Sequence, residues 1–309
     1  MIAAKLRYKS LVVTAGRWEL TGVPYTSARE PGGIAGAIGV LRGLGIAERL
    51  AGLGVEDAGD LDLPAPSGER GPSGLLNESA LVALATATRG RVAEAHRRGR
   101  LPLLAGGDCP VLLGALAAIR DRAEEPALVM LDGHEDAWPP ASSPTGEASD
   151  SEVAIALGRV RRLPKELDRL APLIDPERIA LVGPRDRAEI AAAGVASLGD
   201  EVGLFADALA TVADPAATED RAAQTVAAAG PARGFWLHID LDVLSSSAFA
   251  AVDYPQPGGI GWELLDRLAK GLAGDDRCRG ASIVIYNPDL DPGRADARKL
   301  IEFACRLAS

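Results

Sequence analysis

Short aliphatic runs alternate with longer helical patterns along most of the chain. The runs that fit a strand lie at 11–16, 101–107, 127–133, 178–183, 234–242 and 281–286. The helical patterns lie at 77–98, 109–122, 150–160, 185–194, 218–229, 262–273 and 293–307. Strands that are apolar along their whole length are typical of parallel sheets that helices cover on both faces. The alternation therefore predicts βαβ units and an α/β fold with a mostly parallel sheet.

The composition suits one large domain of this kind. Aromatic residues make up only 4% of the 309 residues, so Ala, Leu, Val and Ile must build the core. Residues 57–76 are rich in Gly, Pro, Ser and acidic residues, which predicts an exposed connection. Because no repeat or break in composition divides the chain, we expect residues 1–309 to form a single domain.

An excess of acidic residues limits the partners that the protein can have. The 43 acidic and 33 basic residues give a net charge of −10, which argues against a nucleic-acid partner. The sequence has no apolar run long enough to span a membrane and no signal-peptide pattern at its start. Its three scattered cysteines do not form a disulfide framework. These features predict a cytoplasmic protein with a small-molecule substrate and no membrane partner.

Three polar segments each follow a strand candidate directly. They are Gly106-Gly107-Asp108-Cys109-Pro110, Asp132-Gly133-His134-Glu135-Asp136 and His238-Ile239-Asp240-Leu241-Asp242. Open parallel sheets bind their ligands at the carboxyl ends of the strands. Since alternate residues of an extended segment point the same way, Asp132, His134 and Asp136 should converge, and so should Asp240 and Asp242.

Carboxylates and an imidazole in this arrangement suit divalent ions such as Mn²⁺, Zn²⁺, Fe²⁺ or Ni²⁺. Burying the four aspartates without compensation would cost of the order of several kcal/mol per charge. The alternative, acids that cap helices or form solvated turns, would explain one isolated Asp-x-Asp pair. It does not explain two clusters and a Gly-Gly-Asp turn that all follow strands. The sequence therefore predicts a two-metal site.

These segments resemble those of the ureohydrolase family, which contains arginases, agmatinases and formiminoglutamases. That family carries a Gly-Gly-Asp-His turn, an Asp-Ala-His-x-Asp segment and a Ser-x-Asp-x-Asp segment. Pro257-Gly258-Gly259 and Tyr286-Asn287-Pro288 match two further family segments, so the resemblance runs from about Gly106 to Pro288. It implies a three-layer α/β/α fold with an eight-stranded, mostly parallel sheet. It also implies a homo-oligomer, either a trimer or a hexamer.

The resemblance implies a role for each residue of the site. Asp132 and Asp240 would bridge two divalent ions, with Mn²⁺ as the first choice and Zn²⁺, Fe²⁺ or Ni²⁺ as alternatives. Asp136 would complete one metal site, and His134 and Asp242 would complete the other. A metal-bridging hydroxide would attack an amidine-like carbon. Asp136 would orient that hydroxide and pass its proton to the leaving nitrogen.

Cys109 occupies the position of the family's histidine ligand. A thiolate binds Zn²⁺ or Fe²⁺ well, and a helix N-terminus after it would lower the thiol pKa. We therefore predict that Cys109 is a metal ligand; the alternative is a small buried hydrophobic residue beside a half-complete site. His238 lies where the family usually has Ser and could approach the site, although a lone histidine on a strand is more often a core residue.

Two other departures affect the substrate. The loop after Asp136 lacks the histidine that arginases use as a proton shuttle, and Glu147 is the candidate for that acid/base work. Ser149 and Asp150 are expected to cap the following helix instead. Ile285 occupies the position of the family's guanidinium-binding glutamate, and an aliphatic side chain cannot pair with a guanidinium. Ordinary arginase or agmatinase activity is therefore not expected.

The predicted function is that of a metal-dependent amidinohydrolase, which hydrolyses a non-peptide C–N bond in a linear amidine or guanidino-type substrate. The alternative is a degenerate ureohydrolase-fold protein with an incomplete metal site, acting as a ligand-binding or structural subunit. A nucleotide-binding α/β protein would need a Gly-rich phosphate loop, and the sequence has none.

Overall fold

The structure is a computed structural model that describes residues 17–228 and 234–309. The strand predicted at 11–16 lies outside the described residues. The eight strands are β1 (Trp18–Gly22), β2 (Glu56–Asp60), β3 (Leu101–Ala105), β4 (Ala127–Leu131), β5 (Ile179–Val182), β6 (Leu204–Ala206), β7 (Phe235–Asp240) and β8 (Cys278–Val284). They form one sheet in the order β2-β1-β3-β8-β7-β4-β5-β6, and every pairing is parallel. The predicted α/β class with a parallel sheet is confirmed.

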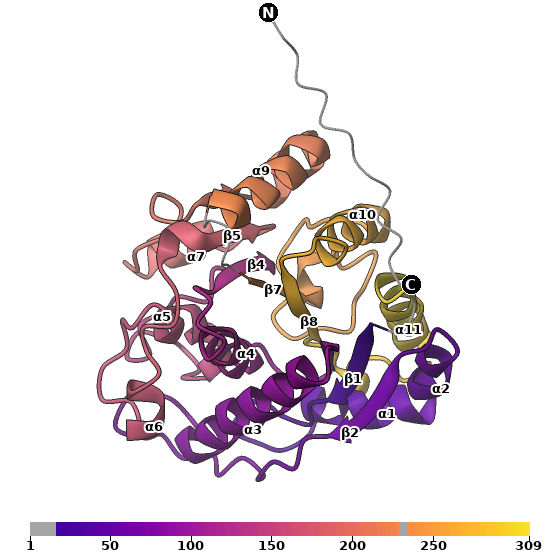
Figure 1. Cartoon of the computed structure of the whole chain (residues 1–309). Coiled ribbons are helices and arrows are strands. Elements are labelled where there is room, and N and C mark those ends of the chain that lie inside the picture. The colour runs from indigo at the N-terminus through magenta and orange to yellow at the C-terminus, as the bar shows by residue number, and fades with distance from the viewer. Residues whose placement is uncertain (1–16, 229–233) are drawn as a thin grey trace, which may run out of the picture.

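Helices cover both faces of this sheet (Figure 1). The α-helices are α1 (Ala37–Gly43), α2 (Ile46–Ala51), α3 (Glu78–Arg97), α4 (Val111–Arg120), α5 (Glu152–Ala156), α6 (Lys165–Asp168), α7 (Arg187–Ala192), α8 (Ala208–Ala213), α9 (Pro215–Ala228), α10 (Trp262–Ala273) and α11 (Ala295–Leu307). Short 3₁₀ turns lie at Gly33–Gly36, Ala148–Asp150, Pro176–Arg178, Leu241–Val243 and Pro288–Leu290. Helices α3 and α4 pack together on one side of the sheet, and α9 and α10 lie on the other (Figure 1). The chain is thus a three-layer α/β/α structure.

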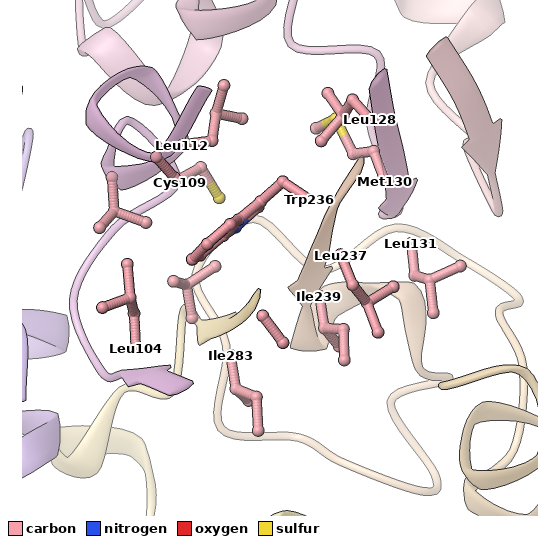
Figure 2. Close-up of a cluster of buried hydrophobic side chains, with 14 of the residues drawn as sticks. Leu104, Cys109, Leu112, Leu128, Met130, Leu131, Trp236, Leu237, Ile239 and Ile283 are labelled. Carbon is pink, nitrogen blue, oxygen red and sulfur yellow. The ribbon is translucent and has the colours of Figure 1, made fainter. Parts of the chain in front are cut away.

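The core lies between the central strands and these helices. Every residue of β3, β4 and β7 is buried, as expected for strands that read as continuous apolar runs. Figure 2 shows Leu104, Leu112, Leu128 and Ile239 around the fully buried Trp236. Aliphatic side chains dominate this cluster, in agreement with the composition. No helix in residues 17–228 or 234–309 is long and apolar enough to cross a membrane.

Several elements differ from the sequence-based prediction. Strand β1 was not predicted because it contains Glu19 and Thr21, although both are fully buried and Glu19 forms an ion pair with Arg98. Strand β2 is an acidic, largely exposed edge strand that overlaps the segment predicted as a connection. The helix predicted at 150–160 is shorter than expected. Its α-helical part, α5, ends before Gly158, which has a φ of +72° beside Pro172.

Candidate metal centre

The three polar segments meet at one edge of the sheet. Asp132 follows the last residue of β4, Asp240 is the last residue of β7, and the Gly-Gly turn follows β3. Strands β4 and β7 are direct neighbours, and β8 alone separates β7 from β3. Because all of these strands are parallel, their carboxyl ends bring the three segments together.

The Gly-Gly turn fixes the position of Cys109. Gly107 has a φ of +71°, and a Cβ atom there would lie 2.5 Å from the carbonyl oxygen of Val23. Only glycine fits such a position without displacing the backbone. The buried carboxylate of Asp108 accepts hydrogen bonds from the backbone N–H groups of Cys109 (2.9 Å) and Ser27 (2.6 Å). These contacts hold Cys109 two residues before helix α4.

Backbone N–H groups orient the aspartates of the other two segments. The N–H of His134 donates to Oδ1 of Asp132 (2.7 Å), and the N–H of Gly133 donates to Oδ1 of Asp242 (2.8 Å). The N–H of Asp242 donates to Oδ1 of Asp240 (2.7 Å). Each of these carboxylates therefore has one oxygen tied to the backbone and one directed at the other side chains.

The six predicted metal ligands lie in one cluster, in which all but the half-buried His134 are buried. Their potential ligand atoms approach within 4.8 Å of one another in two sets, one of Asp132, His134 and Asp136 and the other of Asp132, Asp240 and Asp242. The thiol of Cys109 lies 2.9 Å from Oδ2 of Asp240 and joins the same cluster. Asp132 is fully buried, and its Oδ2 has no hydrogen-bond partner among the described residues.

Glu152 is a member of this cluster that the sequence did not reveal. It is the first residue of α5, is fully buried, and lies within 4.8 Å of potential ligand atoms of Cys109 and Asp136. No N–H or hydroxyl group of another described residue donates to either of its oxygens. Burial and the Glu152 carboxyl group both raise the pKa of Asp136 in the metal-free chain. The one available signal was an acid inside the otherwise apolar stretch Glu152–Leu157.

The electrostatics of the cluster reflect buried negative charge. Burial, reinforced by the neighbouring carboxylates, raises the pKa values of Asp132, Asp136, Glu152 and Asp240 well above the ordinary range. Burial and the Asp240 carboxylate also raise the pKa of the Cys109 thiol. The prediction that a helix N-terminus lowers this thiol pKa is therefore wrong for the metal-free chain, because desolvation and the adjacent carboxylates dominate.

A cavity of about 360 Å³ opens above the cluster. Its lining includes Asp136, Asp240, Asp242, Trp138 and the predicted acid/base residue Glu147. Burial and the nearby carboxylates raise the pKa of Glu147 to about 8, so Glu147 carries a proton near neutral pH. The described residues that line the cavity include several carboxylates and His134 but no Lys or Arg. The cavity therefore favours a cationic ligand.

The loop that carries Glu147 is stabilised differently from the prediction. Oδ2 of Asp150 accepts hydrogen bonds from the hydroxyl groups of Ser143 and Thr145, within the same loop. Ser151 occupies the N-cap position of α5, where no side chain makes a capping hydrogen bond. The prediction that Ser149 and Asp150 cap this helix is therefore wrong, because the loop's own hydroxyl groups use the Asp150 carboxylate.

Three non-glycine residues that line the cavity have positive φ angles. They are Asp136 (46°), Tyr254 (55°) and Ile285 (70°). This backbone region is unfavourable for a β-branched residue such as Ile285, and such strain tends to gather at functional sites. Ile285 is 7% exposed and places an aliphatic side chain in the cavity wall, as the sequence indicated.

Comparison with known proteins agrees with this architecture. The sequence model of the Arginase family matches residues 19–308. The arginase of Bacillus caldovelox is 27% identical over 276 residues, which cover 88% of this chain and 91% of that protein. The arginase of Brevibacillus brevis is 26% identical over 287 residues, covering 90% and 93%. The native structure of the Bacillus caldovelox arginase at pH 5.6 superposes with a TM-score of 0.77 and 24% identity over 95% of this chain and 98% of that one. The chain therefore belongs to the arginase family.

Proposed function

We propose that the protein is a metal-dependent amidinohydrolase of the ureohydrolase type, acting on a non-peptide C–N bond of a linear amidine or guanidino-type substrate. This proposal rests on one observation. Cys109 lies in the same cluster as four aspartates and one histidine from two other segments of the chain. Such a cluster is strongly self-repelling unless cations lie within it.

The donor groups of the cluster fit divalent ions. The unpartnered, fully buried Oδ2 of Asp132 is the clearest single sign, because a buried carboxylate oxygen without a partner is costly. Cys109, Asp132, Asp136 and Asp240 would hold one ion. His134 and Asp242, together with Asp132 and Asp240, would hold a second. Oxygen and nitrogen donors favour Mn²⁺, and the thiol of Cys109 would also suit Zn²⁺ or Fe²⁺.

Two side chains of the cavity would handle protons. A bound pair of divalent ions would lower the pKa of water enough to supply a nucleophile near neutral pH. Asp136, between the cluster and the cavity, would orient the attacking water and receive its proton. Glu147, whose pKa is raised to about 8, would hold a proton near neutral pH and donate it to the leaving nitrogen.

The cavity wall indicates the charge of the substrate. Asp108, Glu147 and Asp253 line it, and Oδ1 of Asp253 accepts a hydrogen bond from Asn287. The carboxylates of Asp108 and Asp253 could neutralise a cationic amidine group, whereas protonated Glu147 and aliphatic Ile285 cannot. The described wall offers no Lys or Arg to bind a substrate carboxylate. We therefore favour a cationic amidine that lacks its own carboxylate near the cluster.

A degenerate, ligand-binding protein is the second candidate, and Ile285 is the observation that favours it. To decide between the two, we would load the protein with Mn²⁺, Zn²⁺, Fe²⁺ or Ni²⁺ and incubate it with guanidino, hydroxyguanidino and formimino compounds. Mass spectrometry would follow the release of urea, ammonia or formamide. The proposal expects turnover that Asp136→Asn abolishes and Glu147→Gln lowers by roughly 10²–10⁴-fold. Binding without turnover by any metal form would support the degenerate protein.

A further inference from the structure

His238 is a buried histidine that the proposed ligand set does not use. It lies on β7, two residues before Asp240, so the two side chains point to the same face of the sheet. Its exposed fraction is 0%. One ring nitrogen lies within 4.8 Å of potential ligand atoms of both Cys109 and Asp132. His238 thus places an imidazole close to the position at which the cysteine replaces the expected histidine.

One nitrogen of this ring is anchored and the other is not. Nδ1 lies 2.7 Å from Oγ of Ser282, and the same oxygen accepts a hydrogen bond from Nε1 of Trp236 at 2.9 Å. Nε2 is buried and has no hydrogen-bond partner among the described residues. A serine oxygen has two lone pairs, so it can accept from Trp236 and from Nδ1–H of His238 together. In that tautomer the lone pair of Nε2 is free, and the ring is held as metal-bound imidazoles usually are.

The environment of the ring leaves Nε2 available to a metal ion. The ring is fully buried, so bulk water does not compete for this nitrogen. A neutral imidazole presents the lone pair that divalent ions require. A potential ligand atom of Asp132 lies within 4.8 Å of the ring, yet no atom of the described residues forms a hydrogen bond with Nε2.

We propose that Nε2 of His238 is a ligand of the metal ion beside Cys109. The family's sequence pattern places an imidazole in the turn after β3. In this chain β7 would supply it, from His238, two residues before Asp240. The two substitutions compensate in size. The smaller Cys109 replaces a histidine in the turn, and the larger His238 replaces a serine on the strand. This inference rests on the proposed function, because it requires an ion in the cluster.

The test uses metal content and Co²⁺ absorption rather than activity. His238→Ser should lower the affinity for one of two ions by at least roughly tenfold, and leave about one tightly held ion per chain. The double variant Cys109→His, His238→Ser should restore the second ion by returning the imidazole to the turn. His96→Ser is the matched control, because His96 bonds the carbonyl of Arg279 away from the cluster and its loss should change nothing. Wild-type affinity for both ions in His238→Ser, or a double variant no better than His238→Ser, would overturn the inference.

A second measurement covers the case in which His238→Ser does not fold. Anomalous diffraction from wild-type crystals soaked in Mn²⁺ should place an ion within roughly 2.0–2.3 Å of Nε2 of His238. An ion pair bound with Nε2 beyond coordination distance and hydrogen-bonded to Asp132 would contradict this inference and leave the proposed function intact. Wild-type protein without any ion would contradict the proposed function itself.

Discussion

The Nδ1 atom of His134 lies 2.7 Å from Oδ2 of Asp242. Although burial opposes it, this contact raises the pKa of His134 to about 10 and lowers that of Asp242. The remaining aspartates of the cluster, Asp132, Asp136 and Asp240, have raised pKa values because they are buried together without such a partner. One imidazolium therefore balances only one carboxylate, and the rest of the cluster needs further positive charge.

The metal-free protein should become less stable as the pH rises from about 7 to 9, above the range in which the lowered pKa of His238 acts in the opposite direction. The pKa of Glu147 is about 8 in the folded protein and 4.5 ordinarily, so the unfolded chain loses this proton at a lower pH than the folded protein does. A rise in pH within this window therefore lowers the free energy of unfolding. The stabilisation from His134 is fully present below 6.5 and is lost as the pH rises through about 10, so it acts in the same direction. The lowered pKa of Asp242 matters only below 3.8, outside this window. Melting temperatures measured in a chelator should therefore fall with pH, and a flat or rising profile would contradict the assignment.

Glu152→Gln should stabilise the metal-free protein and weaken the stabilisation that metal gives. The substitution removes a buried carboxyl group that meets no N–H or hydroxyl donor and that crowds Asp136. We expect a gain of roughly 1–3 kcal/mol in the metal-free unfolding free energy at neutral pH. Glu135→Gln is the matched control. Glu135 is equally buried, but its oxygens accept hydrogen bonds from Ser197 (2.8 Å) and Leu198 (2.5 Å), so the same change should destabilise. If denaturant titrations showed that the unfolding free energy changes in the same direction in both variants, the proposed difference between Glu152 and Glu135 would be refuted.

Ile285→Glu should improve the binding of guanidinium compounds. The side chain lies in the cavity wall, and a carboxylate there could pair with a planar cation. Hydrogen bonds to charged groups are worth roughly 1.5–3 kcal/mol, which corresponds to a Kd or KM for agmatine lower by about tenfold or more. Ile285→Gln has the same length and backbone strain but no charge, and should give little improvement. If calorimetry or kinetics gave equal effects for the two substitutions, a missing negative charge at position 285 would not explain weak guanidinium binding.

The sequence predicted the main ligand cluster because that cluster depends on strand ends. Asp132 and Asp240 follow from where β4 and β7 stop, and the side chains near them follow from alternation along an extended chain. Parallel pairing of the strands then brings these segments together, whatever the conformation of the loops between them. The fold class follows from the same apolar strands.

The parts that the sequence did not reveal depend on long-range contacts. Glu152 enters the cluster through the loop of residues 137–151, whose path follows from its own hydrogen bonds, such as those of Asp150. Glu19 is buried in β1 because Arg98, far along the chain, pairs with it. The thiol pKa of Cys109 depends on Asp240, which only the folded structure places 2.9 Å away. None of these partners can be read from local spacing.

Metal content is the most direct test of the central claim, that the buried cluster is a two-metal site. Protein equilibrated with Mn²⁺ and freed of excess ion should contain two ions per chain by elemental mass spectrometry. Asp132→Ala should remove both, because Asp132 belongs to both halves of the cluster. Asp121→Ala, at an exposed aspartate paired with Arg89, should retain them. Wild-type protein that binds no ion, or an Asp132→Ala variant with full metal content, would contradict the account.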